Sequence, residues 1–139
     1  MQTKRVGNIT EMEVELAFAR LGYPVLIPFG DCERYDLVVD CNGKFYRIQV
    51  KTSHECNRSG SFLFECKSSH RKEGKCVFHL YDESEIDYFA TMFNGKCYIV
   101  PVSECVTAKT LRLGEPKNGM QTNISWAKDY ELETVIKSW

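Results

Sequence analysis

The chain has 139 residues, of which 43% are hydrophobic, and its formal net charge is −1. This size and composition predict a single domain, residues 1–139, with a hydrophobic core, and they exclude a polybasic chain. The polar start lacks the apolar stretch of a signal peptide, and no apolar run approaches the roughly 20 residues of a membrane-spanning helix, so no membrane association is expected.

The seven cysteines are odd in number and scattered, without a Cys-x-x-Cys pair. This pattern favours reduced thiols and therefore an intracellular location, either cytoplasmic or organellar, in a reducing compartment. The alternative is a zinc site formed by Cys66, His70, Cys76 and His79. Only Cys76 and His79 have the usual ligand spacing, and they lie in a strand-like segment, so buried free cysteines are the preferred interpretation.

The first element is a helix that is expected to begin near Asn8 or Thr10. Each can act as an N-cap, because each is followed three residues later by a glutamate. Apolar residues then recur at helical spacing from Val14 onward, and Gly22 is expected to end the helix. Glu11 lies three residues before Val14, on the same side of the helix. It is either an acidic residue favoured near a helix N-terminus or a carboxylate directed at a site.

A short strand is expected at residues 24–28, between two prolines. Two longer strands follow at residues 35–40 and 44–52, on either side of Asn42-Gly43. Asn-Gly between alternating apolar runs is a strong signal for a β-hairpin with a two-residue turn. We therefore expect these two strands to pair in antiparallel fashion.

The turn of this hairpin sets a register. If Asn42 and Gly43 are the two turn residues, Asp36 faces Gln49 and shares a sheet face with it. Lys51 is two residues beyond Gln49, so it lies on that face as well. These three side chains then converge at the open end of the hairpin. A longer turn would shift the register, and a surface ion pair on an ordinary hairpin is the alternative.

The second half is expected to contain strands at residues 61–66 and 76–82, separated by a basic, polar connection at residues 67–75. A second hairpin is expected around Asn94-Gly95, formed by residues 87–93 and 96–102.

The C-terminal part has weaker signals. Residues 103–123 are expected to be largely irregular, and the aromatic residues between Trp126 and Trp139 indicate a helical or docking segment at the C-terminus.

Basic residues concentrate in the middle of the chain. Residues 41–80 carry eight basic and three acidic side chains, whereas both flanks are acidic overall. A local basic surface of this kind suits a polyanion such as DNA, although a solvated face would have the same composition.

Phosphodiester hydrolysis needs a divalent metal, an activated water and a group that stabilises charge. The order Gly7-x-x-x-Glu11, then Asp36 in a strand, then Gln49-x-Lys51 resembles the PD-(D/E)XK nuclease superfamily. The strings PFGDCERYDLVVD, FYRIQVKTS, EIDYFA, YIVP and NISWAKDY resemble, more closely, its small branch of group I intron-encoded homing endonucleases. This likeness extends over most of the chain.

The resemblance implies an α/β fold with a restriction-endonuclease-like core, a central mixed β-sheet flanked by helices. It implies that Asp36 is the principal metal ligand and that Glu11 binds the metal directly or through water. Gln49 stands where the superfamily has glutamate and would offer its side-chain carbonyl. Lys51 would orient or activate the attacking water, or stabilise the phosphate. Tyr35 replaces the proline of the superfamily name.

Gln49 is the main departure from the superfamily pattern. An amide oxygen is a legitimate ligand for a hard metal ion, but it is neutral. We therefore expect weaker metal binding than with glutamate, a preference for one metal ion over two, and retained activity.

The resulting expectation is a site-specific double-strand DNA endonuclease, a homing endonuclease, with Mg²⁺ as cofactor and Mn²⁺ as a substitute. Because the two antiparallel strands of DNA must each be cut, we expect a homodimer or homotetramer. The alternatives are a Holliday-junction resolvase-like nuclease and a non-catalytic DNA-binding module. The expected DNA-binding side chains are Arg58, Lys67, Arg71, Lys72 and Lys75, with Lys4, Arg5 and Arg34 as further candidates.

Overall fold

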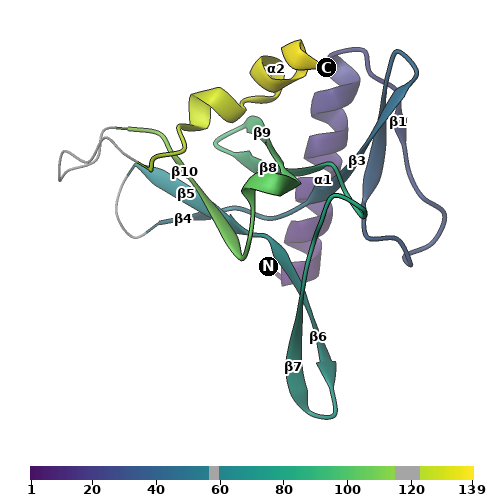
Figure 1. Cartoon of the computed structure of the whole chain (residues 1–139), viewed down its shortest axis with the longest axis vertical. Coiled ribbons are helices and arrows are strands. Elements are labelled where there is room, and N and C mark those ends of the chain that lie inside the picture. The colour runs from purple at the N-terminus through teal and green to yellow at the C-terminus, as the bar shows by residue number, and fades with distance from the viewer. Residues whose placement is uncertain (57–59, 115–122) are drawn as a thin grey trace.

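The computed structural model describes residues 1–56, 60–114 and 123–139, and shows one long helix against a five-stranded sheet (Figure 1). The strands of this sheet lie in the order β1-β2-β3-β8-β9. Their bounds are Val25–Leu26, Leu37–Cys41, Lys44–Val50, Tyr88–Phe93 and Lys96–Pro101. Strand β3 pairs with β8 in parallel, and the other neighbours are antiparallel. The sheet is therefore mixed, and the expected α/β fold class is confirmed.

Helix α1 (Thr3–Arg20) begins earlier than the sequence pattern predicts. Gln2 precedes it without a capping side-chain bond, and Thr10 is buried inside the helix. The Thr10 hydroxyl donates to the Val6 carbonyl oxygen at 3.0 Å, so it bonds within the helix instead of capping its start. The predicted N-cap is therefore wrong, and Glu11 lies in the middle of the helix. The predicted end is correct, because Gly22 follows with φ +88°.

One face of the sheet packs against α1. Val14 and Phe18 of the helix are buried against Leu37, Val39 and Ile48 of the first hairpin. These residues alternate along their strands, so the same face is apolar on both β2 and β3.

The C-terminal segment completes this side of the molecule. It consists of a short 3₁₀ turn (Ala127–Tyr130), helix α2 (Leu132–Val135) and a final turn (Ile136–Ser138). Trp139 stacks on Tyr46 of β3 with ring centroids 3.9 Å apart. The prediction of a helical docking segment is confirmed. No helix in the described ranges is both long and apolar enough to cross a membrane.

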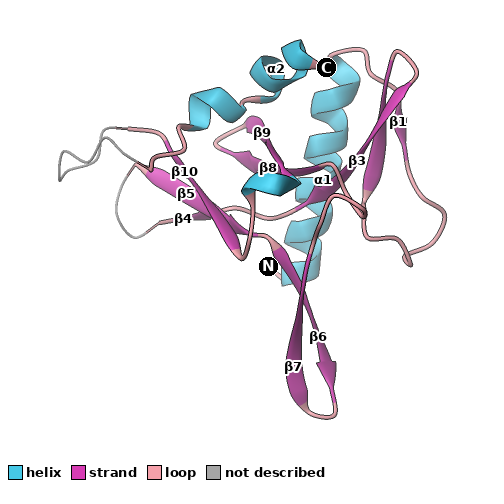
Figure 2. Cartoon of the chain, viewed as in Figure 1, coloured by secondary structure: helices cyan, strands magenta, loops and turns pink. Residues whose placement is uncertain are grey.

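A second, three-stranded sheet lies beside the opposite face, in the order β10-β5-β4 (Figure 2). Its strands are Ala108–Arg112, Ser61–Glu65 and His54–Glu55. A second core cluster forms here, which includes Phe62 and Phe64 of β5 together with Phe89 of β8. The prediction that residues 103–123 are largely irregular misses β10, since that strand is defined by its distant partner β5 and not by local alternation.

Most of the predicted polar connection at residues 67–75 is also strand, so the prediction of a connection there is wrong. Residues Lys67–Lys72 form β6, which pairs with β7 (Lys75–Leu80) in a two-stranded hairpin that projects from the body (Figure 1). The turn residues Glu73 and Gly74 have φ of 53° and 77°, as a two-residue hairpin turn requires. Glu-Gly is a weaker turn signal than Asn-Gly, which explains why the hairpin was not predicted. The hairpin around Asn94-Gly95 is confirmed as β8–β9.

Candidate active site

Asp36 lies immediately before β2, beside the end of β3. The β2–β3 ladder has the predicted register but ends at the Leu37–Ile48 pair. Beyond it, the Asp36 N–H donates to the Ile48 carbonyl oxygen at 2.8 Å. The Asp36 Oδ2 atom accepts a hydrogen bond from the Val50 N–H, also at 2.8 Å. The expected ladder pair between Asp36 and Gln49 is therefore replaced by bonds to both neighbours of Gln49, which hold the carboxylate against the strand.

Glu11 of α1 is close enough to Asp36 for the two charges to interact. Burial, and then the negative charges of Asp36 and Glu15, raise the pKa of Glu11 to about 7. Burial also raises the pKa of Asp36, while the Val50 hydrogen bond and the charge of Lys51 act in the opposite direction. The structure therefore brings Glu11, Asp36 and Lys51 together.

Glu15 is a carboxylate that the sequence analysis missed. Its charge contributes to the raised pKa of both Glu11 and Asp36. The signal was present in the sequence, because Glu15 lies four residues after Glu11 and so on the same side of α1.

Gln49 has an unusual environment for a glutamine. Its Nε2 donates to the Tyr81 hydroxyl at 2.7 Å, while its Oε1 is buried and has no hydrogen-bond partner in the described part of the chain. Side chains alternate along a strand, so Gln49 and Lys51 lie on the opposite face from Ile48, which packs against α1. An unpaired buried carbonyl is costly, so this oxygen is well suited to a cation or a donor that arrives with a ligand.

Lys51 follows two residues later on the same strand edge. Its Nζ donates to the Lys67 carbonyl oxygen at 3.0 Å and lies 5.3 Å from the centre of the Tyr81 ring. The carbonyl that holds this ammonium group belongs to the first residue of β6. Lys51 is thus hydrogen-bonded to the main chain at the base of the projecting hairpin.

The side chain of Arg34 also packs on the ring of Tyr81. Its guanidinium lies 3.8 Å from the ring centre, and it forms an ion pair with Glu85 at 2.8 Å. It also donates to Ser68 Oγ and to the Leu80 carbonyl oxygen. Arg34, a candidate DNA contact from sequence, is therefore engaged in an internal network that joins the site to the hairpin.

A cleft of about 410 Å³ opens beside Gln49 and Lys51. Tyr81 forms part of its wall, and Lys67 and Ser68 at the base of β6 line it as well. The candidate site and the hairpin therefore share one continuous surface.

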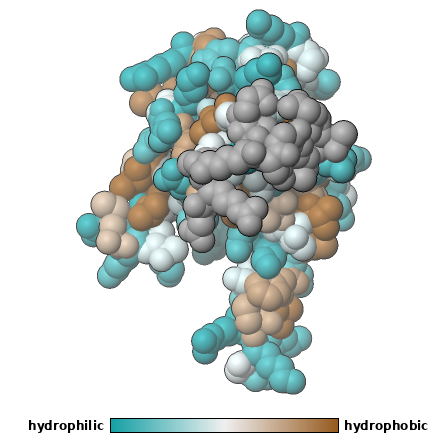
Figure 3. All heavy atoms as spheres, turned by 90° about the vertical axis from the view of Figure 1, so that its left-hand side faces the viewer, coloured by the Kyte–Doolittle hydropathy of each residue, from teal (hydrophilic) through white to brown (hydrophobic). Residues whose placement is uncertain are grey.

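Four of the five expected DNA-binding side chains lie on the hairpin. Lys67, Arg71 and Lys72 are on β6, and Lys75 is on β7. Figure 3 shows the hairpin projecting from the body, with hydrophilic residues gathered toward its tip. The fifth expected residue, Arg58, lies outside the described residues.

Two further candidates lie on a different element. Lys4 and Arg5 are exposed in the first turn of α1, more than 60 residues before the β6–β7 hairpin in the sequence. The hairpin therefore holds most of the expected DNA-binding charge within the described residues.

The zinc alternative is not supported. Cys66 is buried in the core, whereas His70, Cys76 and His79 are exposed on the hairpin. Within residues 1–56, 60–114 and 123–139, no three His, Cys, Asp or Glu side chains gather so as to hold a metal ion. All seven cysteines are free, as predicted.

The residues around Asp36 nevertheless fit a hard divalent ion. Mg²⁺ takes oxygen ligands and typically uses one or two carboxylates, with water completing its coordination. Asp36 and Glu11 could supply the carboxylates, and Gln49 Oε1, which has no hydrogen-bond partner among the described residues, could supply a third, neutral oxygen. This donor set matches oxygen-preferring metals and lacks the sulfur and imidazole ligands of zinc.

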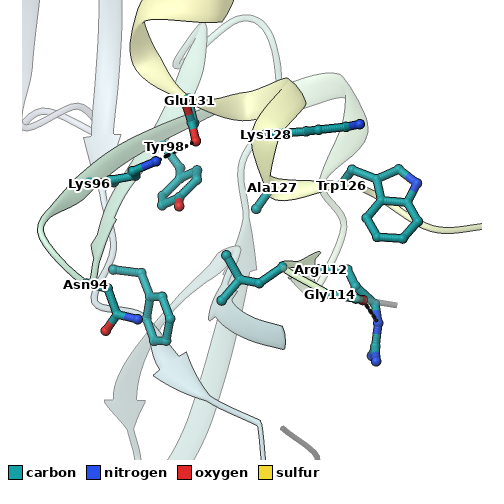
Figure 4. A pocket seen from close by; sticks show the side chains of 11 residues that line it. Asn94, Lys96, Tyr98, Arg112, Gly114, Trp126, Ala127, Lys128 and Glu131 are labelled. Atoms are coloured by element: carbon teal, nitrogen blue, oxygen red, sulfur yellow. Dashed lines mark hydrogen bonds and ion pairs between the residues drawn. The ribbon is translucent and has the colours of Figure 1, made fainter. Parts of the chain in front are cut away.

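A second cleft, of about 580 Å³, lies between the β8–β9 turn, the end of β10 and the C-terminal segment (Figure 4). Its wall includes Tyr98 and Trp126, together with Lys96 and Glu131, which form an ion pair of 3.1 Å. It shares no lining residue with the site around Gln49, and it contains no pair of carboxylates. The site around Asp36 and Gln49 is therefore the better candidate for an active site.

Comparison with known proteins identifies similar chains and a similar fold. Protein 5.3 of Escherichia phage T7 is 25% identical over 115 residues, which cover 83% of this chain and 93% of the phage protein. The solved structure of I-Ssp6803I, a bacterial homing endonuclease, superimposes with a TM-score of 0.77 at 21% identity, covering 99% of this chain and 97% of that one. The family model of PD-(D/E)XK endonucleases matches residues 1–133. The chain therefore belongs to the PD-(D/E)XK endonuclease family.

Proposed function

We propose that the chain, acting as one domain over residues 1–139, is a site-specific endonuclease that cuts double-stranded DNA with a divalent metal. Mg²⁺ is the expected cofactor and Mn²⁺ its substitute. The observation that carries the proposal is that the charge of Asp36 interacts with those of Glu11 and Lys51. Gln49, two residues before Lys51, adds a buried Oε1 that has no hydrogen-bond partner among the described residues. The similar I-Ssp6803I is a homing endonuclease, and we propose the same class of activity here.

Three side chains would hold the metal in this proposal. Asp36 Oδ2 is fixed by the Val50 N–H, so Oδ1 is the oxygen offered to the ion. Glu11 approaches from α1, either directly or through water, and Gln49 contributes Oε1. When bound, the ion would polarise a phosphate oxygen and lower the pKa of a bound water.

Lys51 is the cationic group of the proposed site. Its Nζ is held by the Lys67 carbonyl, which leaves its other hydrogens for a phosphate oxygen or the attacking water. A fixed positive charge at this place stabilises the negative charge that builds up on the phosphate during hydrolysis. The bond to Lys67 places the ammonium group at the base of the hairpin, where DNA seated on the hairpin would be within its reach.

The β6–β7 hairpin is the proposed DNA contact. It carries four cationic side chains and one anionic side chain, Glu73, at its turn. A two-stranded ribbon of this kind is narrow enough to enter the major groove. Phosphate contacts from the lysines would position the duplex, and the polar side chains between them would read bases.

Self-association is the remaining element of the proposal. A double-strand cut requires one site for each of the two antiparallel DNA strands, and each chain has one such site. Met12, Leu16 and Ile27 are 58%, 48% and 58% exposed, and they line a shallow cleft of about 680 Å³ between α1 and β1. Such an apolar patch suits a second copy of the chain. Leu16→Glu should lower the mass measured by sedimentation, whereas Val106→Glu, at another exposed apolar site outside this cleft, should not.

Plasmid cleavage tests the function. Supercoiled DNA is incubated with the protein and Mg²⁺ or Mn²⁺, with EDTA as control, and nicked and linear products are separated. Linear duplex should be preferred over a four-way junction of the same sequence. Selective cutting of the junction would instead favour the resolvase alternative, and DNA binding without cutting under all metals would favour the non-catalytic module.

A further inference from the structure

We infer that Phe78 reads thymine in the DNA, by packing its ring against the methyl group that this base presents in the major groove. The inference rests on the proposed function, because it concerns the DNA contact of the β6–β7 hairpin. It begins from exposed apolar side chains on an element that is rich in basic residues. Phe78 is 55% exposed, and Leu80, two residues later on β7, is 53% exposed.

The β6–β7 hairpin has two unlike faces. Directly opposed residues of an antiparallel ladder share a face, so the pairing of Ser69 with Phe78 defines the face that holds the ring. The other face carries the stacked rings of His70 and His79, with centroids 4.8 Å apart. The face that holds Phe78 combines basic and polar side chains of β6 with apolar side chains of β7. Its members are Lys67, Ser69, Arg71, Cys76, Phe78 and Leu80.

The face with Phe78 continues from the cleft of the candidate active site. Lys67 and Ser69, which belong to this face, both line the cleft. The Lys67 ammonium group lies 4.2 Å from the centre of the Phe78 ring, so the ring contacts a residue of the cleft wall. Ser68 also lines the cleft, but it belongs to the opposite face, and its hydroxyl accepts a hydrogen bond from Arg34 at 2.7 Å. We therefore expect DNA that enters the cleft to meet the face that holds Phe78.

The chemistry of the major groove makes thymine the base that suits this face. A two-stranded ribbon fits the groove and turns one of its faces toward the base edges. Among the four bases only thymine carries a methyl group at this edge, and a phenylalanine ring has no hydrogen bond to offer the polar atoms of the others. Apolar contact with the methyl group removes both from water, which is favourable. Lys67 and Arg71, on the same face, supply positive charge for phosphates.

The first measurement compares the sites that each protein cuts in a randomised DNA library with Mg²⁺. Wild type is compared with Phe78→Ala and Phe45→Ala. Phe45 gives a matched control, because it is a 58% exposed phenylalanine on β3, outside the β6–β7 hairpin. Phe78→Ala should lose a thymine preference that wild type shows, while the other positions of the recovered site are kept. Phe45→Ala should recover the wild-type site.

The second measurement removes only the methyl group. The recovered site is synthesised with thymine or with uracil at the affected position, and binding in EDTA is followed by fluorescence anisotropy. Uracil should weaken binding by wild type and by Phe45→Ala about fourfold, as expected for one buried methyl group. It should change binding by Phe78→Ala less than about 1.5-fold. This dependence on the methyl group is a readout that a purely structural role for Phe78 would not produce.

An unchanged thymine preference in Phe78→Ala, or an equal loss of binding with uracil in Phe78→Ala and wild type, would overturn the inference and leave the proposed function standing. A lower mass of Phe78→Ala in sedimentation, with the recovered site unchanged, would overturn it in favour of a contact between copies of the chain. Wild-type protein that cuts no DNA, or cuts without a recurring sequence, would overturn both.

The inference stays testable if Phe78→Ala does not fold, as judged by circular dichroism. Phe78→Gln then takes its place in both measurements, since glutamine also lacks the apolar ring. The wild-type protein alone gives a further test. Binding that is insensitive to uracil at every thymine of the recovered site would overturn the inference without any variant.

Discussion

The Asp36 carboxylate accepts a hydrogen bond from the Val50 N–H at 2.8 Å, although the ladder between their strands has already ended. This bond replaces a backbone ladder contact with a side-chain contact. It ties the carboxylate of the residue before β2 to the main chain of β3 through Oδ2, and Oδ1 takes no part in this bond.

The first prediction concerns Asp36→Asn. The amide oxygen of asparagine can still accept the Val50 bond, so the fold and the melting temperature should change little. Loss of the ligand charge should lower the rate of DNA cleavage by at least about a thousandfold, equivalent to roughly 4 kcal/mol of transition-state stabilisation. Circular dichroism and DNA binding serve as controls, and an unfolded variant would show instead that the Asp36–Val50 bond is needed for stability.

The second prediction concerns Gln49→Glu. This change restores the negative charge that the family pattern has at this position, so metal binding should be kept or strengthened. The new carboxylate lies on the residue between Ile48 and Val50, which both bond Asp36, so the metal-free protein should become less stable while the metal-saturated protein does not. Thermal melts with and without Mg²⁺ measure both effects. Loss of all metal binding would mean that the site requires a neutral amide.

The third prediction concerns the charge of the hairpin. Lys72 and Lys75 lie opposite each other at its tip. Replacing both by alanine should weaken binding to any duplex sequence and make the slope of log affinity against log salt about 1.8 units less negative, if each contacts one phosphate. Fluorescence anisotropy at several salt concentrations provides the measurement.

Lys128 and Lys137 give a matched control for this double substitution, since both are exposed and lie in the C-terminal segment. Replacing them by alanine should leave the salt slope unchanged. Equal effects of the two double variants would show that binding depends on overall charge and not on the hairpin.

The fourth prediction concerns pH and the metal-free protein. The pKa of Glu11 is raised to about 7 by burial and by the nearby acidic groups. Between pH 4.5 and 7 the folded state therefore binds more protons than the unfolded state, so stability contributed by this group falls as pH rises through that window. Glu11→Gln removes the carboxylate and with it this loss of stability at higher pH.

In EDTA at pH 8, Glu11→Gln should accordingly raise the melting temperature by about 2 °C, a small gain because solvent screens a half-buried group. At pH 4.5 the variant and wild type should melt alike. A variant that is less stable than wild type at pH 8 would contradict the unfavourable environment assigned to Glu11.

The first hairpin was predictable because its signals are local. Asn42-Gly43 sets the turn and the alternation of apolar residues sets the face, so the ladder register from Leu37 to Cys41 follows directly from the sequence. The same reasoning placed Gln49 and Lys51 on one face. It could not foresee that Asp36 leaves the ladder and bonds through its side chain.

The features that sequence reasoning missed depend on partners far away in the chain. Strand β10 exists because it pairs with β5, and the Tyr81 hydroxyl bonds Gln49, which lies 32 residues earlier. The unpredicted start of α1 has a different cause, because Thr10 can cap a helix or bond within one, and both use the same hydroxyl.

Selection from a randomised DNA library tests the central claim most directly. The library is incubated with wild-type protein and Mg²⁺, and the ends of the products are sequenced, in parallel with EDTA and Asp36→Asn samples. The account predicts double-strand ends at a recurring sequence in the wild-type sample with Mg²⁺ and none in the other two. The absence of cleavage with both Mg²⁺ and Mn²⁺, or cleavage that persists in Asp36→Asn, would contradict it.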